Sequence, residues 1–112
     1  EDDATWLELD ELLKTRWTHP LGGQIGVSAA AIDSSDGTTT EKVYSFCFAR
    51  RARKIIAIKG ADGNRPWLEA SKSKKVGGRL HIVGVDTIKT HLRDRASLGT
   101  LMFSSDLPSV WY

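Results

Sequence analysis

The sequence has little of the chemistry that defines several large protein classes. Its 112 residues contain one cysteine, Cys47, which excludes a disulfide framework and a cysteine-based zinc site and suits a reducing cytoplasm. No apolar run approaches the roughly 20 residues that span a membrane, and no glycine-rich run matches the dinucleotide-binding or P-loop patterns. Ser34 and Ser35 lack the flanking glycines of a serine-hydrolase nucleophile elbow. Membrane proteins, P-loop enzymes and serine hydrolases are therefore not expected.

Length and composition indicate one globular domain. A hydrophobic fraction of 40% and a charged fraction of 27% are typical of soluble proteins, and 112 residues suffice for a single core. The first residues, EDDATW, contain neither an initiator methionine nor a signal-peptide pattern. We therefore expect residues 1–112 to be a single domain, or part of one, taken from a longer protein.

The charges are distributed unevenly along the chain. The formal net charge is only +2, but acidic residues crowd positions 1–11 and basic residues fill the middle of the sequence. This asymmetry predicts a polyanionic partner, although a solvated basic face is the alternative explanation. The basic residues concerned are Arg50, Arg51, Arg53, Lys54, Lys59, Lys72, Lys74, Lys75 and Arg79.

Hydrophobic periodicity predicts alternating helices and strands. Such alternation is typical of an α/β layered domain, here with the first helix as an outer arm. The first strand ends in a continuous apolar run, so we expect it to be central and covered on both faces. The expected helices are residues 6–17, 40–52 and 87–97, the expected strands are 24–33, 53–60, 79–87 and 98–104, and 61–78 form a long exposed loop before a final tail at 105–112.

Two aspartates carry the candidate chemistry. Asp33 and Asp86 each follow an apolar strand, and open α/β sheets bind ligands at the carboxyl ends of their strands. Carboxylates are the ligands that Mg²⁺ and Mn²⁺ prefer, so the pair predicts a divalent-metal site. Either aspartate could instead cap the helix that follows it. Asp36 is a further candidate ligand or an ordinary turn residue, and Lys59 either binds a phosphate or stays solvated.

Four stretches of the sequence resemble one known family. In order and spacing, they are similar to the nuclease region of the large terminase subunit of tailed phages, of the lambda-like GpA type. The stretches are AAAIDSSDGTTTEKVYSFCFARR (29–51), IIAIKGADGNRPW (55–67), RLHIVGVDTIKTHLRDR (79–95) and LMFSSDLPSVWY (101–112). Together they cover nearly the whole chain.

The resemblance implies an RNase H-like nuclease domain, with a central mixed sheet flanked by helices. Such a nuclease cuts concatemeric double-stranded DNA during packaging, with carboxylates that bind two Mg²⁺ or Mn²⁺ ions. Asp33 matches the family's first-strand metal aspartate, and Asp86 matches the later strand-end aspartate. The remaining acidic ligand is expected beyond Tyr112 and the ATPase motor upstream, so we expect weak or no cleavage by this piece alone.

The resemblance also implies partners and a place of action. The basic residues Arg50, Arg51, Arg53, Lys59 and the loop cations Lys72, Lys74, Lys75 and Arg79 are expected to track the DNA backbone without reading sequence. The full-length protein is expected to bind the terminase small subunit and the portal, in the cytoplasm of the host bacterium.

Two other functions compete with the nuclease. The first is a DNA-binding or assembly module without catalysis, such as a prophage remnant that keeps the fold and the basic loop. Metal-independent, salt-sensitive DNA binding that survives the loss of Asp33 would favour it. The second is a small nucleotide-binding α/β domain with Asp33 at a switch point, which competition between a mononucleotide and metal would favour.

Overall fold

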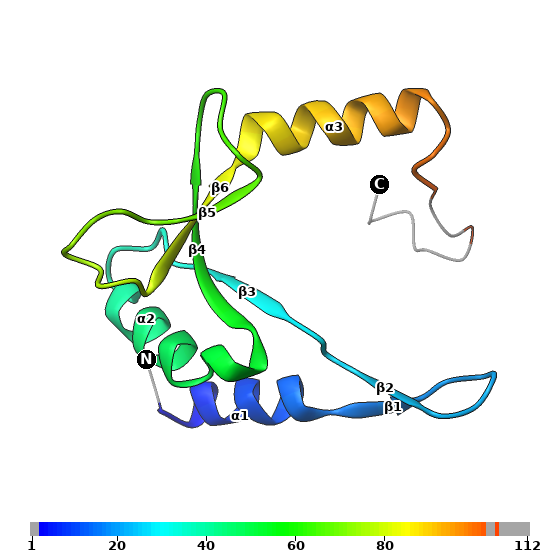
Figure 1. Cartoon of the computed structure of the whole chain (residues 1–112). Coiled ribbons are helices and arrows are strands. Elements are labelled where there is room, and N and C mark those ends of the chain that lie inside the picture. The colour runs from blue at the N-terminus through cyan, green and yellow to red at the C-terminus, as the bar shows by residue number, and fades with distance from the viewer. Residues whose placement is uncertain (1–2, 103–104, 106–112) are drawn as a thin grey trace.

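The computed structural model describes residues 3–102 and residue 105 (Figure 1). They form a mixed α/β structure. Its elements are α1 (Asp3–Lys14), β1 (Arg16–Thr18), β2 (Gln24–Gly26), β3 (Ala30–Asp33), α2 (Thr40–Ala49), the short 3-10 helix η1 (Arg51–Arg53), β4 (Ile55–Ala61), β5 (Leu68–Ala70), β6 (Leu80–Gly84) and α3 (Val85–Ser97).

The main sheet has four strands in the order β3-β4-β6-β5. Strands β3, β4 and β6 are parallel, and β5 runs antiparallel to β6. Helix α2 connects β3 to β4, so these elements form a β-α-β unit of the kind that parallel pairing requires. The expected α/β class with a mixed sheet is confirmed.

The core lies between α2 and one face of the sheet. Val43, Phe46 and Cys47 are spaced to share one side of α2, and all three are buried against Ile55 and other apolar residues of the sheet. The indole ring of Trp6 lies 5.1 Å from the Phe46 ring, so α1 packs on the same cluster. The remaining buried apolar residues are Tyr44, Ala57 and Leu80.

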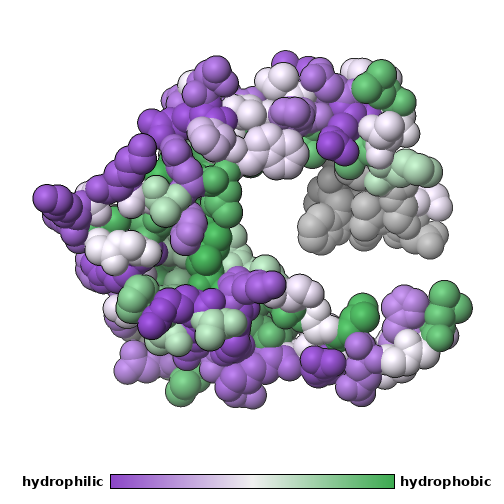
Figure 2. All heavy atoms as spheres, viewed as in Figure 1, coloured by the Kyte–Doolittle hydropathy of each residue, from purple (hydrophilic) through white to green (hydrophobic). Residues whose placement is uncertain are grey.

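The opposite face of the sheet carries apolar side chains that no described helix covers. Side chains alternate along a strand, so Ile56 and Ile58 of β4 point away from α2, as does Val83 of β6. All three are only half-buried. Figure 2 shows hydrophobic atoms on this inner side of the curved molecule. The radius of gyration, 16.8 Å, exceeds the about 13 Å of a compact domain of this length, because α3 and the β1-β2 hairpin extend away from the sheet.

The prediction of one central strand over residues 24–33 is wrong. Gln24–Gly26 instead pairs with Arg16–Thr18 in a hairpin, which also ends the first helix at Lys14 rather than at residue 17. Only Ala30–Asp33 joins the main sheet, and it lies at the edge with every second residue exposed. The alanines make the run apolar in sequence, but the strand is not covered on both faces.

The later part of the chain differs from expectation in two places. The expected loop 61–78 contains β5, which pairs with β6 and forms the edge of the sheet opposite β3. Residues 98–102 form no strand, and the remainder of the expected strand 98–104 lies outside the described residues, as does the expected tail apart from residue 105. Helix 40–52 ends at Ala49 and continues as η1, and the last helix begins two residues early, at Val85.

Candidate metal and DNA-binding site

Asp33 and Asp86 lie at the same edge of the sheet. Asp33 is the last residue of β3, and Asp86 is the second residue of α3, which follows β6 without a loop. Because β3, β4 and β6 are parallel, their carboxyl ends meet at one edge, where open α/β sheets place ligands. Both aspartates are exposed.

The carboxylate of Asp33 is oriented by the turn that follows it. Its Oδ1 atom accepts a hydrogen bond from the Ser35 hydroxyl at 2.6 Å and another from the Ser35 backbone N–H at 2.9 Å. Both bonds lower the pKa of Asp33 below its ordinary value, and the bond from the hydroxyl contributes most. The N-cap of α2 is Thr39, so Asp33 is not the helix cap that the alternative interpretation required.

Asp86 joins the loop after β4 to the start of α3. Its Oδ2 atom accepts a hydrogen bond from the backbone N–H of Gly63 at 2.8 Å. The N-cap position of α3 is Gly84, so Asp86 does not fill it either. Beside Asp86 lies a shallow pocket of about 310 Å³, lined by Gly63, Asn64, Asp86, Thr87, Thr90 and His91.

The register of the sheet offsets the two carboxylates. Asp33 pairs with Ile58 of β4, and Ile58 pairs with His81 of β6. Two strand spacings, about 10 Å, therefore separate Asp33 from β6. Asp86 lies further along, beyond the end of that strand. The two residues share an edge but are not side by side, and residues 3–102 and 105 contain no group of three His, Cys, Asp or Glu residues that could hold a metal ion.

Asp36 organises the turn before α2. Its carboxylate accepts hydrogen bonds from the Thr38 backbone N–H and hydroxyl and from the Thr39 hydroxyl. The Thr38 N–H is the first cause of a lowered pKa at Asp36. The Asp36 backbone carbonyl also accepts from Thr40 at 2.8 Å. The structure therefore gives Asp36 the turn role that the sequence left open, and its role as a ligand stays a prediction.

Two of the predicted DNA-binding arginines have a structural partner. Arg50 and Arg53 both donate to Asp10 Oδ1, at 2.8 and 2.7 Å, and Lys14 lies 3.1 Å from Asp10 Oδ2. Asp10 is only 8% exposed. The hydrogen bond from Arg50, followed by that from Arg53, keeps the pKa of Asp10 far below its ordinary value. This network joins α1 to the end of α2, a role that the sequence prediction did not include.

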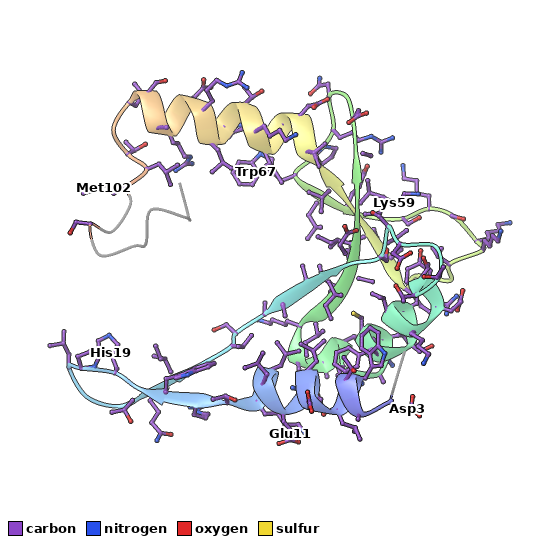
Figure 3. The ribbon with its side chains drawn as sticks, turned by 180° about the vertical axis from the view of Figure 1, so that it is seen from behind. Asp3, Glu11, His19, Lys59, Trp67 and Met102 are labelled. Carbon is purple, nitrogen blue, oxygen red and sulfur yellow. The ribbon has the colours of Figure 1, made fainter. Side chains whose placement is uncertain are left out.

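The other predicted cations divide into two groups. Arg51 lies over the ring of Phe48, and Arg79 pairs with Glu41 at 3.1 Å, so both have local contacts. Lys59, labelled in Figure 3, is exposed in β4 between β3 and β6. Of the predicted DNA-binding cations, those with neither an ion pair nor a ring contact among the described residues are Lys59, Lys72, Lys74 and Lys75.

The contacts that hold the Asp86 region were not predicted from the sequence. The Thr87 hydroxyl donates to the Arg65 backbone carbonyl at 2.8 Å. Trp67, which is labelled in Figure 3, contacts the His91 ring edge-on with 5.0 Å between centroids. These residues are separated by more than 20 positions, so no local pattern reveals the pairing. The only sequence signal was a loop rich in Gly and Pro beside an Asp-Thr pair.

Gly84 lets this loop approach the end of β6. A Cβ atom at Gly84 would clash with the carbonyl oxygen of Pro66 and lie 3.1 Å from that of Arg65. We expect Gly84→Ala to lower the free energy of unfolding by about 1–3 kcal/mol, because the backbone must move to admit the methyl group. Urea denaturation measures the change. Gly37→Ala, where the new Cβ would have no neighbour within 4 Å, is the control, and equal effects at the two positions would contradict the close approach.

The comparison with protein families covers the whole chain. Residues 1–112 match the family model described as terminase large subunit gpA, endonuclease domain. No curated protein and no solved structure matches the chain. None of the described helices is long and apolar enough to cross a membrane. The match confirms the resemblance seen in the four sequence stretches, and the family implies a DNA substrate. The chain therefore belongs to the family of terminase large-subunit gpA endonuclease domains.

Proposed function

We propose that this chain is the part of a phage packaging nuclease that holds divalent metal and cuts concatemeric double-stranded DNA. Asp33 and Asp86 are the proposed metal ligands. The observation that carries the proposal is the position of these two exposed carboxylates, at the carboxyl ends of parallel strands in a chain that matches an endonuclease family along its whole length.

The two carboxylates are ligands of the type that Mg²⁺ and Mn²⁺ prefer, but two residues are fewer than such a site needs. Carboxylate oxygens suit Mg²⁺ and Mn²⁺, and the hydrogen bonds from Ser35 favour the ionised form of Asp33 that a metal requires. The described residues hold no group of three possible ligands. Any further protein ligands would therefore come from residues outside the described ones.

Each residue of the site has a distinct part in the proposed reaction. Two bound ions would activate water and stabilise the leaving 3′ oxygen of the phosphodiester. Ser35 fixes the orientation of the Asp33 carboxylate through two hydrogen bonds. The backbone N–H of Gly63 orients the Asp86 carboxylate through one hydrogen bond. The exposed cations Lys59, Lys72, Lys74 and Lys75 would contact phosphates without reading sequence. The four arginines also remain predicted DNA contacts, although each already has a contact within the structure; they are Arg50, Arg51, Arg53 and Arg79.

The fold and the partners extend the same proposal. We assign the sheet to the RNase H-like class because of its layered α/β order and its strand-end carboxylates. The direct β3-α2-β4 step lacks the hairpin with which such folds usually begin. In the full-length protein the domain would act with an ATPase motor, the small subunit and the portal, in the cytoplasm of the phage's host.

Plasmid cleavage with controlled metal tests the proposed function. We expect the chain to nick supercoiled plasmid in Mg²⁺ or Mn²⁺, slowly because its described residues hold no group of three possible ligands, and to stop when EDTA removes the metal. Gel electrophoresis over time measures the nicked fraction. Cleavage that continues in EDTA, or no cleavage when the remaining ligand is supplied in the full-length large subunit, would contradict the proposal.

A DNA-binding module without catalysis is the second candidate. It is favoured by one observation, namely that the described residues contain no group of three possible metal ligands. Under this function the chain would bind duplex DNA equally well with and without metal, and the Asp33→Asn variant would bind like the wild type. Such binding without cleavage by the full-length protein would support this candidate over the nuclease.

A further inference from the structure

Helix α3 is exposed from Lys89 to its end, and its first turn is half-buried except at Asp86. None of its residues, Val85–Ser97, is buried, and it extends from the end of β6 away from the α2 layer (Figure 1). Among the described residues, Asp86 and Thr87 hold its first turn through hydrogen bonds to the loop at Gly63 and Arg65, and the ring of His91 in its second turn contacts Trp67. Its exposed side chains are therefore free to contact another molecule.

The polar side of α3 begins at Asp86. Lys89 and Arg93 follow Asp86 at i+3 and i+7, so the three residues lie within about 60° of arc on the helix. Their positions along the axis extend about 10 Å from Asp86, the distance over which one DNA strand presents about three phosphates. The apolar residues Ile88 and Leu92 lie on a different side of the helix, about 100° from this row.

Lys89 and Arg93 have no ion pair among the described residues. In this they differ from Arg50 and Arg53, whose charges are held by Asp10. Exposed cations without a carboxylate partner can neutralise DNA phosphates and so release the cations condensed on the DNA. Release of those ions is a favourable term that the paired arginines supply only in part.

We propose that the row of Lys89 and Arg93 on α3 binds the phosphate backbone of duplex DNA and leads it to Asp86. The inference rests on the proposed function and adds to it a contact surface outside the basic residues predicted from the sequence. Lys89 and Arg93 are positioning residues, because they hold the DNA beside a proposed metal ligand. Phosphate contacts of this kind fix register on the duplex and carry no sequence information.

Two single variants of the same helix test the proposal. Arg93→Gln removes a charge from the row, and Arg95→Gln removes the same charge about 200° away around the helix. Both residues are exposed and neither has an ion pair among the described residues, so both variants should fold alike. Fluorescence anisotropy of a labelled duplex in EDTA measures binding without cleavage, between roughly 50 and 200 mM salt. Lys89→Gln/Arg93→Gln is the double variant.

We expect the slope of log K against log salt to fall in magnitude by about 0.9 for Arg93→Gln, by about twice that for the double variant, and not at all for Arg95→Gln. Equal losses for Arg93→Gln and Arg95→Gln, or wild-type slopes for all variants, would overturn the inference while leaving the nuclease intact. The expected slopes without metal-dependent cleavage by the full-length protein would overturn the proposed function alone. No binding by the wild type would overturn both.

Discussion

Asp10→Asn is expected to give the largest loss of stability of any single charge removal in this chain. The substitution leaves Arg50 and Arg53 without the carboxylate oxygen that both now contact, at 2.8 and 2.7 Å. Breaking a largely buried ion pair by removing one partner costs more than a surface pair does, because the remaining charges stay desolvated. We expect the melting temperature to fall by on the order of 5 °C or more, as measured by circular dichroism.

Glu11→Gln is the matched control for Asp10→Asn. Glu11 lies on the same helix, is exposed, and pairs only with Lys14, at 3.5 Å. The same change of charge there should move the melting temperature little, because exposed pairs contribute little. Equal shifts in melting temperature for the two variants would show that the ion pairs of Asp10 do not stabilise the packing of α1 against the end of α2.

The ion pairs of Asp10 with Arg50 and Arg53 also predict how the stability of the fold depends on pH. The pKa of Asp10 is lowered in the folded chain, chiefly by the Arg50 hydrogen bond, so the unfolded chain takes up the proton first as the pH falls. The stabilisation is therefore complete at neutral pH and is lost as the pH falls below the ordinary aspartate pKa of about 4. Wild type and Asp10→Asn should converge in melting temperature towards pH 2. A constant difference down to that pH would contradict this assignment.

Asp33→Asn and Asp86→Asn are expected to have the largest effects on activity. An amide oxygen is a weaker ligand for Mg²⁺ than a carboxylate, and each substitution also removes a negative charge from the proposed site. We expect each variant to reduce metal-dependent nicking by at least about 100-fold, since even the groups that merely orient metal ligands are worth 10- to 100-fold. Asparagine keeps an oxygen that can accept the hydrogen bonds from Ser35 and from the Gly63 N–H, so both variants should stay folded.

Asp94→Asn is the matched control for these two variants. Asp94 is an exposed aspartate of α3, eight residues after Asp86, and no side-chain hydrogen bond or ion pair among the described residues joins it to the proposed site. Nicking should be unchanged in this variant. Wild-type nicking by Asp33→Asn or by Asp86→Asn would remove that residue from the ligand set, and an equal loss in Asp94→Asn would point to a general effect of charge.

Local sequence patterns predicted the elements whose side chains meet a continuous core. Val43, Phe46 and Cys47 at helical spacing identified α2, and the isoleucine-rich run at Ile55 identified β4, because in both cases burial follows the sequence period. The prediction of the first strand was wrong because burial does not follow its sequence pattern. The alanines before Asp33 are apolar but small, and their run could not distinguish an edge strand from a central one.

Contacts between distant residues set the limit of prediction for the candidate site. The position of Asp33 at the end of β3, and that of Asp86 shortly after the end of β6, were accessible from the sequence, because each aspartate follows an apolar run. The partners of Arg50 and Arg53 were not, since Asp10 lies about 40 positions away and reads as one acid among many at the start of the chain. The register that offsets the two aspartates likewise depends on the pairing of β3, β4 and β6.

Titration with Mn²⁺ by calorimetry tests the central claim most directly, because it measures the metal site without requiring cleavage. The wild type, Asp33→Asn, Asp86→Asn and the double variant are compared, with Asp94→Asn as control. We predict binding by the wild type and by Asp94→Asn, and its loss in both single variants. If Mn²⁺ binds no better to the wild type than to the double variant, the two aspartates hold no metal in this chain, and the DNA-binding module becomes the better account of its function.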